Sequence, residues 1–121
     1  WWGKGFQEEW ARFEAVLKEL NKPLLLAGDF NNPAVQEGYQ AILASPLVLQ
    51  DAYEVAKERS GSFTVPPEID GWKGNSEPLR IDYVFTTKDM QVENLHVVFD
   101  GKNSPQVSDH YGLQAELAWK D

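Results

Sequence analysis

Cysteine is missing from the 121 residues of this sequence, and so is any run of about 18 apolar residues. The first absence excludes disulfides and thiolate zinc sites, and it suits a reducing compartment, so we expect a cytoplasmic protein. The second leaves no candidate for a membrane-spanning helix. An initiator methionine is also missing, since the chain starts at Trp1. We therefore expect a processed, trimmed or excised piece of a longer protein, whose targeting signal lies out of view.

Basic side chains are scarce, because 11 lysines and arginines stand against 19 acidic residues, for a net charge of −8. This balance argues against a protein that binds nucleic acid by neutralising its phosphates, although it does not exclude a nuclease that recruits metal ions. The hydrophobic content of 42% and the aromatic content of 12% are typical of a folded globular chain. The length fits one domain, or part of one, over residues 1–121.

Apolar residues recur every three or four positions near the start of the chain, which predicts a helix with one face in the core. They are Phe6, Trp10, Phe13, Leu17 and Leu20. Asn21 to Pro23 end this helix, and the apolar run at residues 24–27 predicts a strand buried on both faces. Further helices are expected at about residues 34–44 and 51–58.

Alternation of apolar and polar residues predicts three strands in the second half of the chain. They cover residues 80–86, 92–99 and 111–119. A brief strand is also expected at residues 62–65, within a loop from Ser60 to Pro78 that is rich in glycine, proline, serine and asparagine. Loops of this length are usually functional or mobile.

The stretch LAGDFNN, residues 26–32, ends an apolar run with polar side chains. A strand that ends in Gly-Asp delivers Asp29 to the end of a sheet, where sites in α/β proteins gather, and glycine lets a ligand come close. The same residues also form a good Asx-type turn. This motif alone leaves both interpretations open.

Two more motifs place acidic residues at strand ends. Asp82 lies within RIDYVF, where a carboxylate needs a partner or water, and an ion pair with Arg80 or simple exposure is the structural alternative. The tripeptide SDH places Asp109 and His110 just before the last strand. Because these adjacent side chains point apart in an extended chain, one can bind a cation while the other meets a substrate oxygen or another carboxylate. A capping turn is the alternative for this tripeptide.

These motifs together supply three aspartates, Asn31 and one histidine, and oxygen ligands without cysteine suit Mg²⁺ or Mn²⁺. The ordered motifs GDFN, RIDYVF and SDH resemble the C-terminal half of the endonuclease/exonuclease/phosphatase superfamily. This superfamily includes DNase I, abasic-site endonucleases, neutral sphingomyelinases and inositol-polyphosphate phosphatases. The resemblance runs from about Trp10 to the end of the chain.

The resemblance implies a role for each residue. Asp29 orients and deprotonates the attacking water, and Asn31 holds the nucleophile or a phosphate oxygen. Asp109 ligates the metal ion, directly or through water. His110 donates to a phosphate oxygen as negative charge develops, while Asp82 orients and charges the imidazole. These roles match what hydrolysis of a phosphate ester needs, namely a base, charge neutralisation and a metal ion.

The resemblance also implies an α/β fold. The family forms a DNase I-like four-layer α/β sandwich, of which this chain is the C-terminal half, with one mixed, mainly antiparallel sheet and covering helices. The N-terminal half of the family supplies an asparagine and the principal metal-binding glutamate, and neither can be placed here. We therefore expect the missing half as a partner, weak metal binding and little activity for the chain alone. We also expect an exposed apolar sheet face that invites dimerisation.

Two loops are candidates for substrate recognition, WWGKGF at the start and PPEIDGWKGNSEP before Arg80. We expect Trp1, Trp2 and Trp72 to stack on sugar rings. The polar side chains expected to meet hydroxyls or phosphate are those of Lys4, Lys73 and Asn75. Burial of the tryptophans in the complete protein is the alternative.

The opening residues and the GW-containing loop resemble those of bacterial maltose 6′-phosphate phosphatases, a sugar-phosphate branch of the superfamily. The sequence thus predicts part of a Mg²⁺-dependent phosphoesterase that acts on a small sugar phosphate, and the acidic charge favours such a substrate over nucleic acid. The first alternative is a metal-dependent phosphodiesterase of the nuclease or sphingomyelinase type. The second is a non-catalytic interaction domain that retains these motifs as relics.

Overall fold

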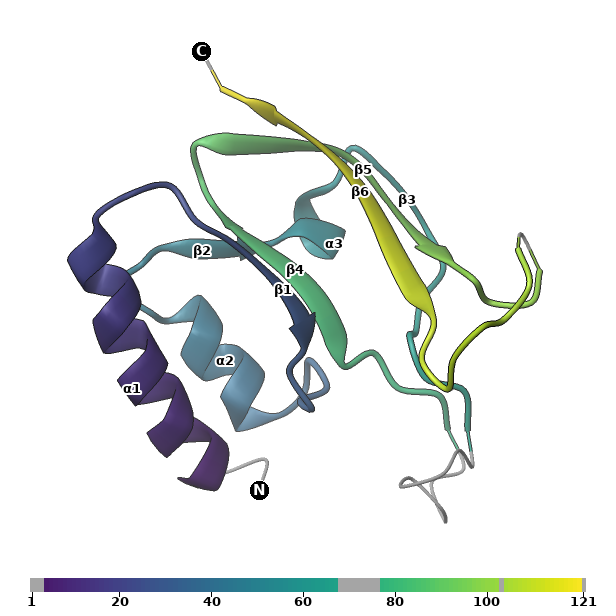
Figure 1. The fold of residues 1–121 in the computed structure, drawn as a ribbon, viewed down its shortest axis with the longest axis horizontal. Coiled ribbons are helices and arrows are strands. Elements are labelled where there is room, and N and C mark those ends of the chain that lie inside the picture. Colours follow the sequence, from purple (N-terminus) through teal and green to yellow (C-terminus); the bar gives the residue numbers. More distant parts are fainter. Residues whose placement is uncertain (1–3, 68–76, 103, 121) are drawn as a thin grey trace.

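The computed structural model describes residues 4–67, 77–102 and 104–120, and these form three helices and six strands. Their order confirms the α/β class (Figure 1). The elements are α1 (Lys4–Leu20), β1 (Leu25–Asp29), α2 (Glu37–Leu43), β2 (Leu49–Asp51), α3 (Ala52–Val55), β3 (Glu58–Ser60), β4 (Asp82–Thr87), β5 (Met90–Val98) and β6 (Gly112–Trp119). Within these ranges no helix has the length and apolar character needed to cross a bilayer.

The strands form two sheets of three strands, whereas the sequence predicted one mixed sheet. The first has the order β1-β4-β2, and the second has the order β3-β5-β6. The pairing is mainly antiparallel, as expected, and only β3 with β5 runs parallel among these strands. The division has a simple cause, because both edges of β4 are already paired when the chain turns into β5. The strand β5 therefore starts a new sheet.

One hydrophobic cluster lies between the first sheet and the helices α1 and α2, which cover one of its faces (Figure 1). Phe85 of β4 and Ile42 of α2 are both 0% exposed at its centre. The helix α1 contributes Phe6 and Trp10 to the same cluster. The apolar period seen in the sequence thus packs α1 onto the sheet.

A second cluster lies between the other face of β4 and the second sheet. Val84 packs there with Val92 and Leu95 of β5, and Ala52 of α3 closes the cluster. Partly buried side chains of β6, such as Leu113 and Leu117, cover it from the second sheet. The described part of the chain is therefore built as a helical layer, a first sheet and a second sheet.

The expectation that the strand after α1 is buried on both faces is wrong. The strand β1 lies at the edge of the first sheet, and Leu25 is 48% exposed, because the second sheet covers β4 and leaves β1 open. The helix α1 also leaves Phe13 and Leu20 about half exposed. The strand expected at residues 62–65 is reduced to a single bridge between Val65 and Leu79.

We predict that Phe85→Ala lowers the free energy of unfolding by about 3–5 kcal/mol, because it empties the centre of the first cluster. Val35 is 89% exposed, so Val35→Ala is a control that changes stability by about 0.5 kcal/mol or less. Urea denaturation followed by circular dichroism measures both. Equal effects of the two substitutions would contradict the placement of this core.

Candidate active site

The pairing of β1 with β4 places two carboxylates side by side. The register sets Asp29 opposite Asp82, and directly opposed residues of an antiparallel pair point to the same face. That face is also the face of Val84, which looks toward the second sheet. Just before Asp29, Gly28 has a φ of 150°, a conformation that favours glycine. The two carboxylates thus lie at one end of the space between the sheets.

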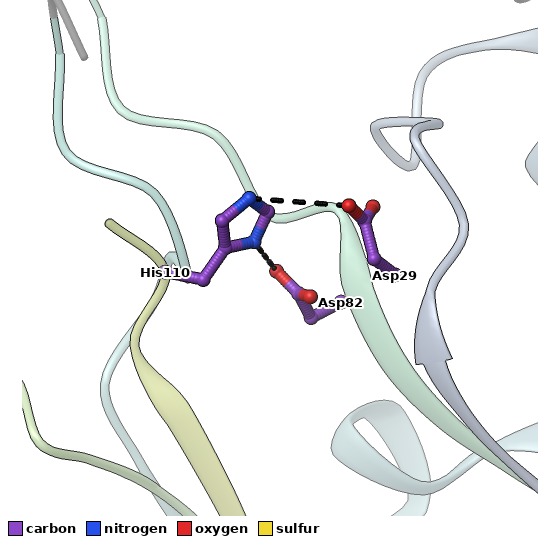
Figure 2. A group of neighbouring side chains, drawn as sticks. All are labelled: Asp29, Asp82 and His110. Atoms are coloured by element: carbon purple, nitrogen blue, oxygen red, sulfur yellow. Dashed lines mark hydrogen bonds and ion pairs between the residues drawn. The ribbon is translucent and has the colours of Figure 1, made fainter. Parts of the chain in front are cut away.

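His110 reaches these carboxylates from the loop that precedes β6. Its Nδ1 lies 2.8 Å from Oδ2 of Asp82, and its Nε2 lies 3.9 Å from Oδ2 of Asp29. Figure 2 shows the imidazole between the two side chains, with one nitrogen directed at each. An ionised Asp82 can only accept a hydrogen bond, so Nδ1–H donates to it. This leaves Nε2 as the atom that can give or take a proton beside Asp29.

The surroundings of His110 raise its pKa. Burial alone lowers this pKa, but the hydrogen bond to Asp82 and the negative charges of Asp82, Asp29 and Asp109 outweigh burial. The side chain is 25% exposed, so solvent screens these charges only in part. The imidazolium form is therefore favoured in the folded chain compared with an exposed histidine.

Asp29 is held by its own turn. The backbone N–H of Asn31 donates to Oδ1 of Asp29 over 2.9 Å, and Asn31 has a φ of 53°. The Asx turn and the strand-end carboxylate are therefore both present in this motif. Burial raises the pKa of Asp29, and repulsion from Asp82 and Asp109 adds to this rise, against the lowering effects of the Asn31 N–H and of His110. A carboxylate with a raised pKa is a better base than an ordinary one.

The tripeptide SDH also forms both a turn and part of the site. The Ser108 hydroxyl donates to Oδ1 of Asp109 over 3.1 Å and accepts the N–H of His110 over 3.2 Å. Asp109 is exposed, and its charge acts on both Asp29 and His110. The structure thus brings Asp29, Asp82 and His110 together. Asn31 contributes its backbone N–H, and Asp109 acts on Asp29 and His110 through its charge.

The charges of this site suit a divalent cation. One donor atom each from Asp29, Asp82 and His110 lies within 4.8 Å of the others. Three carboxylates stand against one imidazole, and their mutual repulsion adds to the burial that raises the pKa of Asp29. A hard cation with oxygen ligands relieves this excess negative charge. Within this group, Oδ2 of Asp82 already accepts the hydrogen bond from Nδ1 of His110.

The candidate substrate residues are largely untested by the structure. Trp2, Trp72, Lys73 and Asn75 lie outside the described residues. Lys4 begins α1, and its Nζ lies 4.0 Å from an oxygen of Glu8. Beside Asp29 there is a hollow of about 230 Å³ lined mainly by aromatic side chains of α1 and by Phe30.

A buried charged network near the site was not predicted from the sequence. Arg80 is paired with Asp51 at 2.9 Å rather than with Asp82, so the ion-pair alternative for Asp82 is wrong. Tyr39 also donates to Asp51, over 2.8 Å. The single proton of the Tyr83 hydroxyl is shared between the carbonyls of Asn32 and Arg80, at 2.5 and 2.9 Å. This contact connects the loop after Asp29 to the start of β4. In the sequence, the only indication of this network is Asp51, an acidic residue that follows the apolar residues 46–49.

Comparisons with known proteins agree on one family. Residues 1–110 match the model of the Endonuclease/Exonuclease/phosphatase family. A solved protein of that family from Leptotrichia buccalis is 31% identical over 88% of this chain, with a TM-score of 0.73. A mannosyl-6-phosphatase from Bacteroides thetaiotaomicron is 26% identical over 97% of the chain, with a TM-score of 0.74. The chain spans only 41% and 47% of these two proteins, and no curated protein matches it.

We predict that the chain loses stability as the pH rises above about 6.5, because His110 binds its proton more tightly when folded than when unfolded. The stabilisation is complete below the unfolded pKa and is lost as the pH passes through the raised pKa of the folded state. Urea denaturation at a series of pH values from 5.5 to about 9 measures this slope.

Asp82→Asn is the matched variant for this test, because it removes the main group that raises the His110 pKa. Its stability is expected to vary less over the same pH range. A variant with the full pH dependence of the parent chain would show that the Asp82–His110 contact does not cause it.

Proposed function

Because the chain belongs to the endonuclease/exonuclease/phosphatase family, we propose that the protein containing it hydrolyses a phosphate ester with the help of Mg²⁺ or Mn²⁺. The observation that carries this proposal is the imidazole of His110 held between Asp82 and Asp29 at the junction of the two sheets (Figure 2). Such an arrangement joins a charged proton donor with a neighbouring base.

Asp29 is the proposed base. Its carboxylate is fixed by the N–H of Asn31, so it meets the attacking water in a set orientation with little reorganisation. Its raised pKa strengthens it as a proton acceptor. The side-chain amide of Asn31 is assigned to the nucleophile or to a phosphate oxygen.

His110 is the proposed donor to the phosphate. Asp82 fixes its orientation through Nδ1 and favours the imidazolium, so Nε2–H is directed at the space beside Asp29. A positive N–H donor there stabilises the negative charge that develops on the phosphate oxygens during cleavage.

The proposed ligand of the metal ion is Asp109, whose charge also acts on Asp29. A bound divalent cation would supply charge neutralisation at the phosphate. The fit rests on the excess of carboxylates over cationic groups at the site and on the oxygen ligands that they offer.

A sugar phosphate such as maltose 6′-phosphate is the proposed substrate. The likeness to a mannosyl-6-phosphatase at 26% identity supports a phosphorylated sugar, and the net charge of −8 favours a small substrate over a nucleic acid track. Substrate recognition is assigned to Lys4 and, beyond the described residues, to Trp2, Trp72, Lys73 and Asn75.

The remaining part of the family domain is the proposed partner of this chain. The chain spans less than half of its solved relatives, and β1 leaves Leu25 and Ala27 exposed on an open sheet face. We propose that this face packs against the rest of the domain, which would complete the metal site. In its absence the same face favours self-association.

The first experiment measures phosphate release by the complete protein, with Mg²⁺ and with EDTA. The substrates are maltose 6′-phosphate and glucose 6-phosphate, with plasmid nicking and sphingomyelin cleavage as diester assays. We expect metal-dependent release from a sugar phosphate, and a loss of roughly 10²–10⁴-fold in Asp29→Ala.

The matched control is Asp89→Ala, which removes a carboxylate in the turn after β4, at the opposite end of the first sheet. It is expected to keep full activity. Cleavage of DNA or lipid instead would overturn the substrate and keep the catalytic roles. Inactivity on every substrate would favour the relic interaction domain.

For the chain alone, we predict self-association that Leu25→Lys weakens roughly tenfold or more, because a charge on the open face opposes its burial. Val35→Lys, at an exposed turn away from this face, is the control. Sedimentation equilibrium measures both. A monomeric parent chain at millimolar concentration would contradict the proposed contact.

A further inference from the structure

Thr64 is completely buried, at 0% exposure, in the segment that runs between the two sheets. Its hydroxyl oxygen accepts two backbone N–H groups, that of Ile81 over 3.2 Å and that of Asp82 over 3.3 Å. A hydroxyl oxygen has two lone pairs, so it can accept both bonds at once. The side chain of Thr64 therefore holds the backbone at the position from which the Asp82 carboxylate extends.

The backbone of Thr64 contacts the chain next to His110, which is the hydrogen-bond partner of Asp82. Its carbonyl accepts the N–H of Tyr111 over 2.7 Å, directly after His110. Its own N–H donates to the carbonyl of Leu79 over 2.8 Å, which fixes Thr64 beside the entry to β4. One residue thus bonds to the chain next to Asp82 and to the chain next to His110.

This link is needed because Asp82 and His110 stand on different sheets. Asp82 begins β4 of the first sheet, while His110 precedes β6 of the second (Figure 1). The described strand pairings do not join β4 to β6, so no ladder of backbone hydrogen bonds sets the distance between them. A hydrogen bond of 2.8 Å between side chains requires both backbones to be held within a few tenths of an ångström.

We propose that Thr64 is a positioning residue that sets the geometry of the Asp82–His110 pair. The β-branched side chain has few rotamers, so its hydroxyl stays directed at the two N–H groups. Valine has the same shape without the oxygen, and it would leave two buried N–H groups without an acceptor. The consequence for catalysis rests on the proposed function, whereas the geometric role does not.

The first test uses this chain and does not depend on activity. Thr64→Val, Thr64→Ser and Thr86→Val are compared by nuclear magnetic resonance. Thr86 is the matched control, since it is also 0% exposed but its hydroxyl meets Gln50 near the other end of β4. The readouts are the downfield Nδ1 proton of His110 and the hydrogen exchange of the Asp82 and Tyr111 amides.

We expect Thr64→Val to lose the Nδ1 proton signal and to speed exchange of the Asp82 amide about tenfold or more. Thr64→Ser retains the oxygen and is expected to keep both, as is Thr86→Val. An unchanged signal in Thr64→Val overturns the proposal, and so does an equal loss in Thr86→Val. If Thr64→Val does not fold, loss of the signal in a folded Thr64→Ser chain also overturns it.

The second test uses the complete protein on the substrate that it cleaves. Misplacement of a reacting group by about 1 Å costs about 100-fold, so Thr64→Val is expected to lower kcat strongly with little change in KM. Thr64→Ser is expected to restore kcat. Normal kcat in Thr64→Val overturns the catalytic consequence. A protein without phosphoesterase activity refutes the proposed function, and the resonance measurements still decide the role of Thr64.

Discussion

The antiparallel pairing of β1 with β4 is the constraint on which the rest of the site depends. Register in a sheet has a period of two, so a slip of one residue would turn Asp82 to the opposite face from Asp29. The aromatic core holds this register, because Tyr83 and Phe85 are buried against α2 on the other face of β4. The same alternation that buries these rings presents Asp82 to the second sheet. Packing of Tyr83 and Phe85 on one face of β4 therefore fixes the position of the Asp82 carboxylate on the other face.

The charged residues near β4 form two groups with different roles. Arg80 neutralises Asp51 in a buried network with Tyr39, and burial raises the pKa of Tyr39, which keeps its hydroxyl protonated as a donor. Two residues after Arg80 in the chain, Asp82 faces a histidine and two more carboxylates. The first group is balanced and serves the structure, whereas the second has excess negative charge. Such an imbalance costs stability unless a proton or a cation relieves it, and this is typical of a functional site.

Much of this arrangement follows from local patterns in the sequence. The period of α1, the strands near residues 80–119 and the acidic residues at strand ends were all predictable, because each depends on residues close in sequence. The division into two sheets was not, since it depends on both edges of β4 being occupied. The pairing of Arg80 with Asp51 was missed for a similar reason, because it joins residues that lie 29 positions apart in the chain. No pattern in the sequence indicates the role of Thr64, because this role depends on contacts among three segments that are distant in the chain.

The turns at Asp29 and Ser108 show why the structural and functional interpretations of these motifs are not alternatives. The N–H of Asn31 that closes the Asx turn is also the donor that orients the Asp29 carboxylate. The Ser108 hydroxyl that caps the N–H of His110 also holds the carboxylate of Asp109. Each turn orders a side chain that would otherwise lose entropy when a ligand binds. A short polar turn at a strand end therefore orients the side chains of a site before a ligand binds. The same hydrogen bonds stabilise the turn and hold the carboxylates.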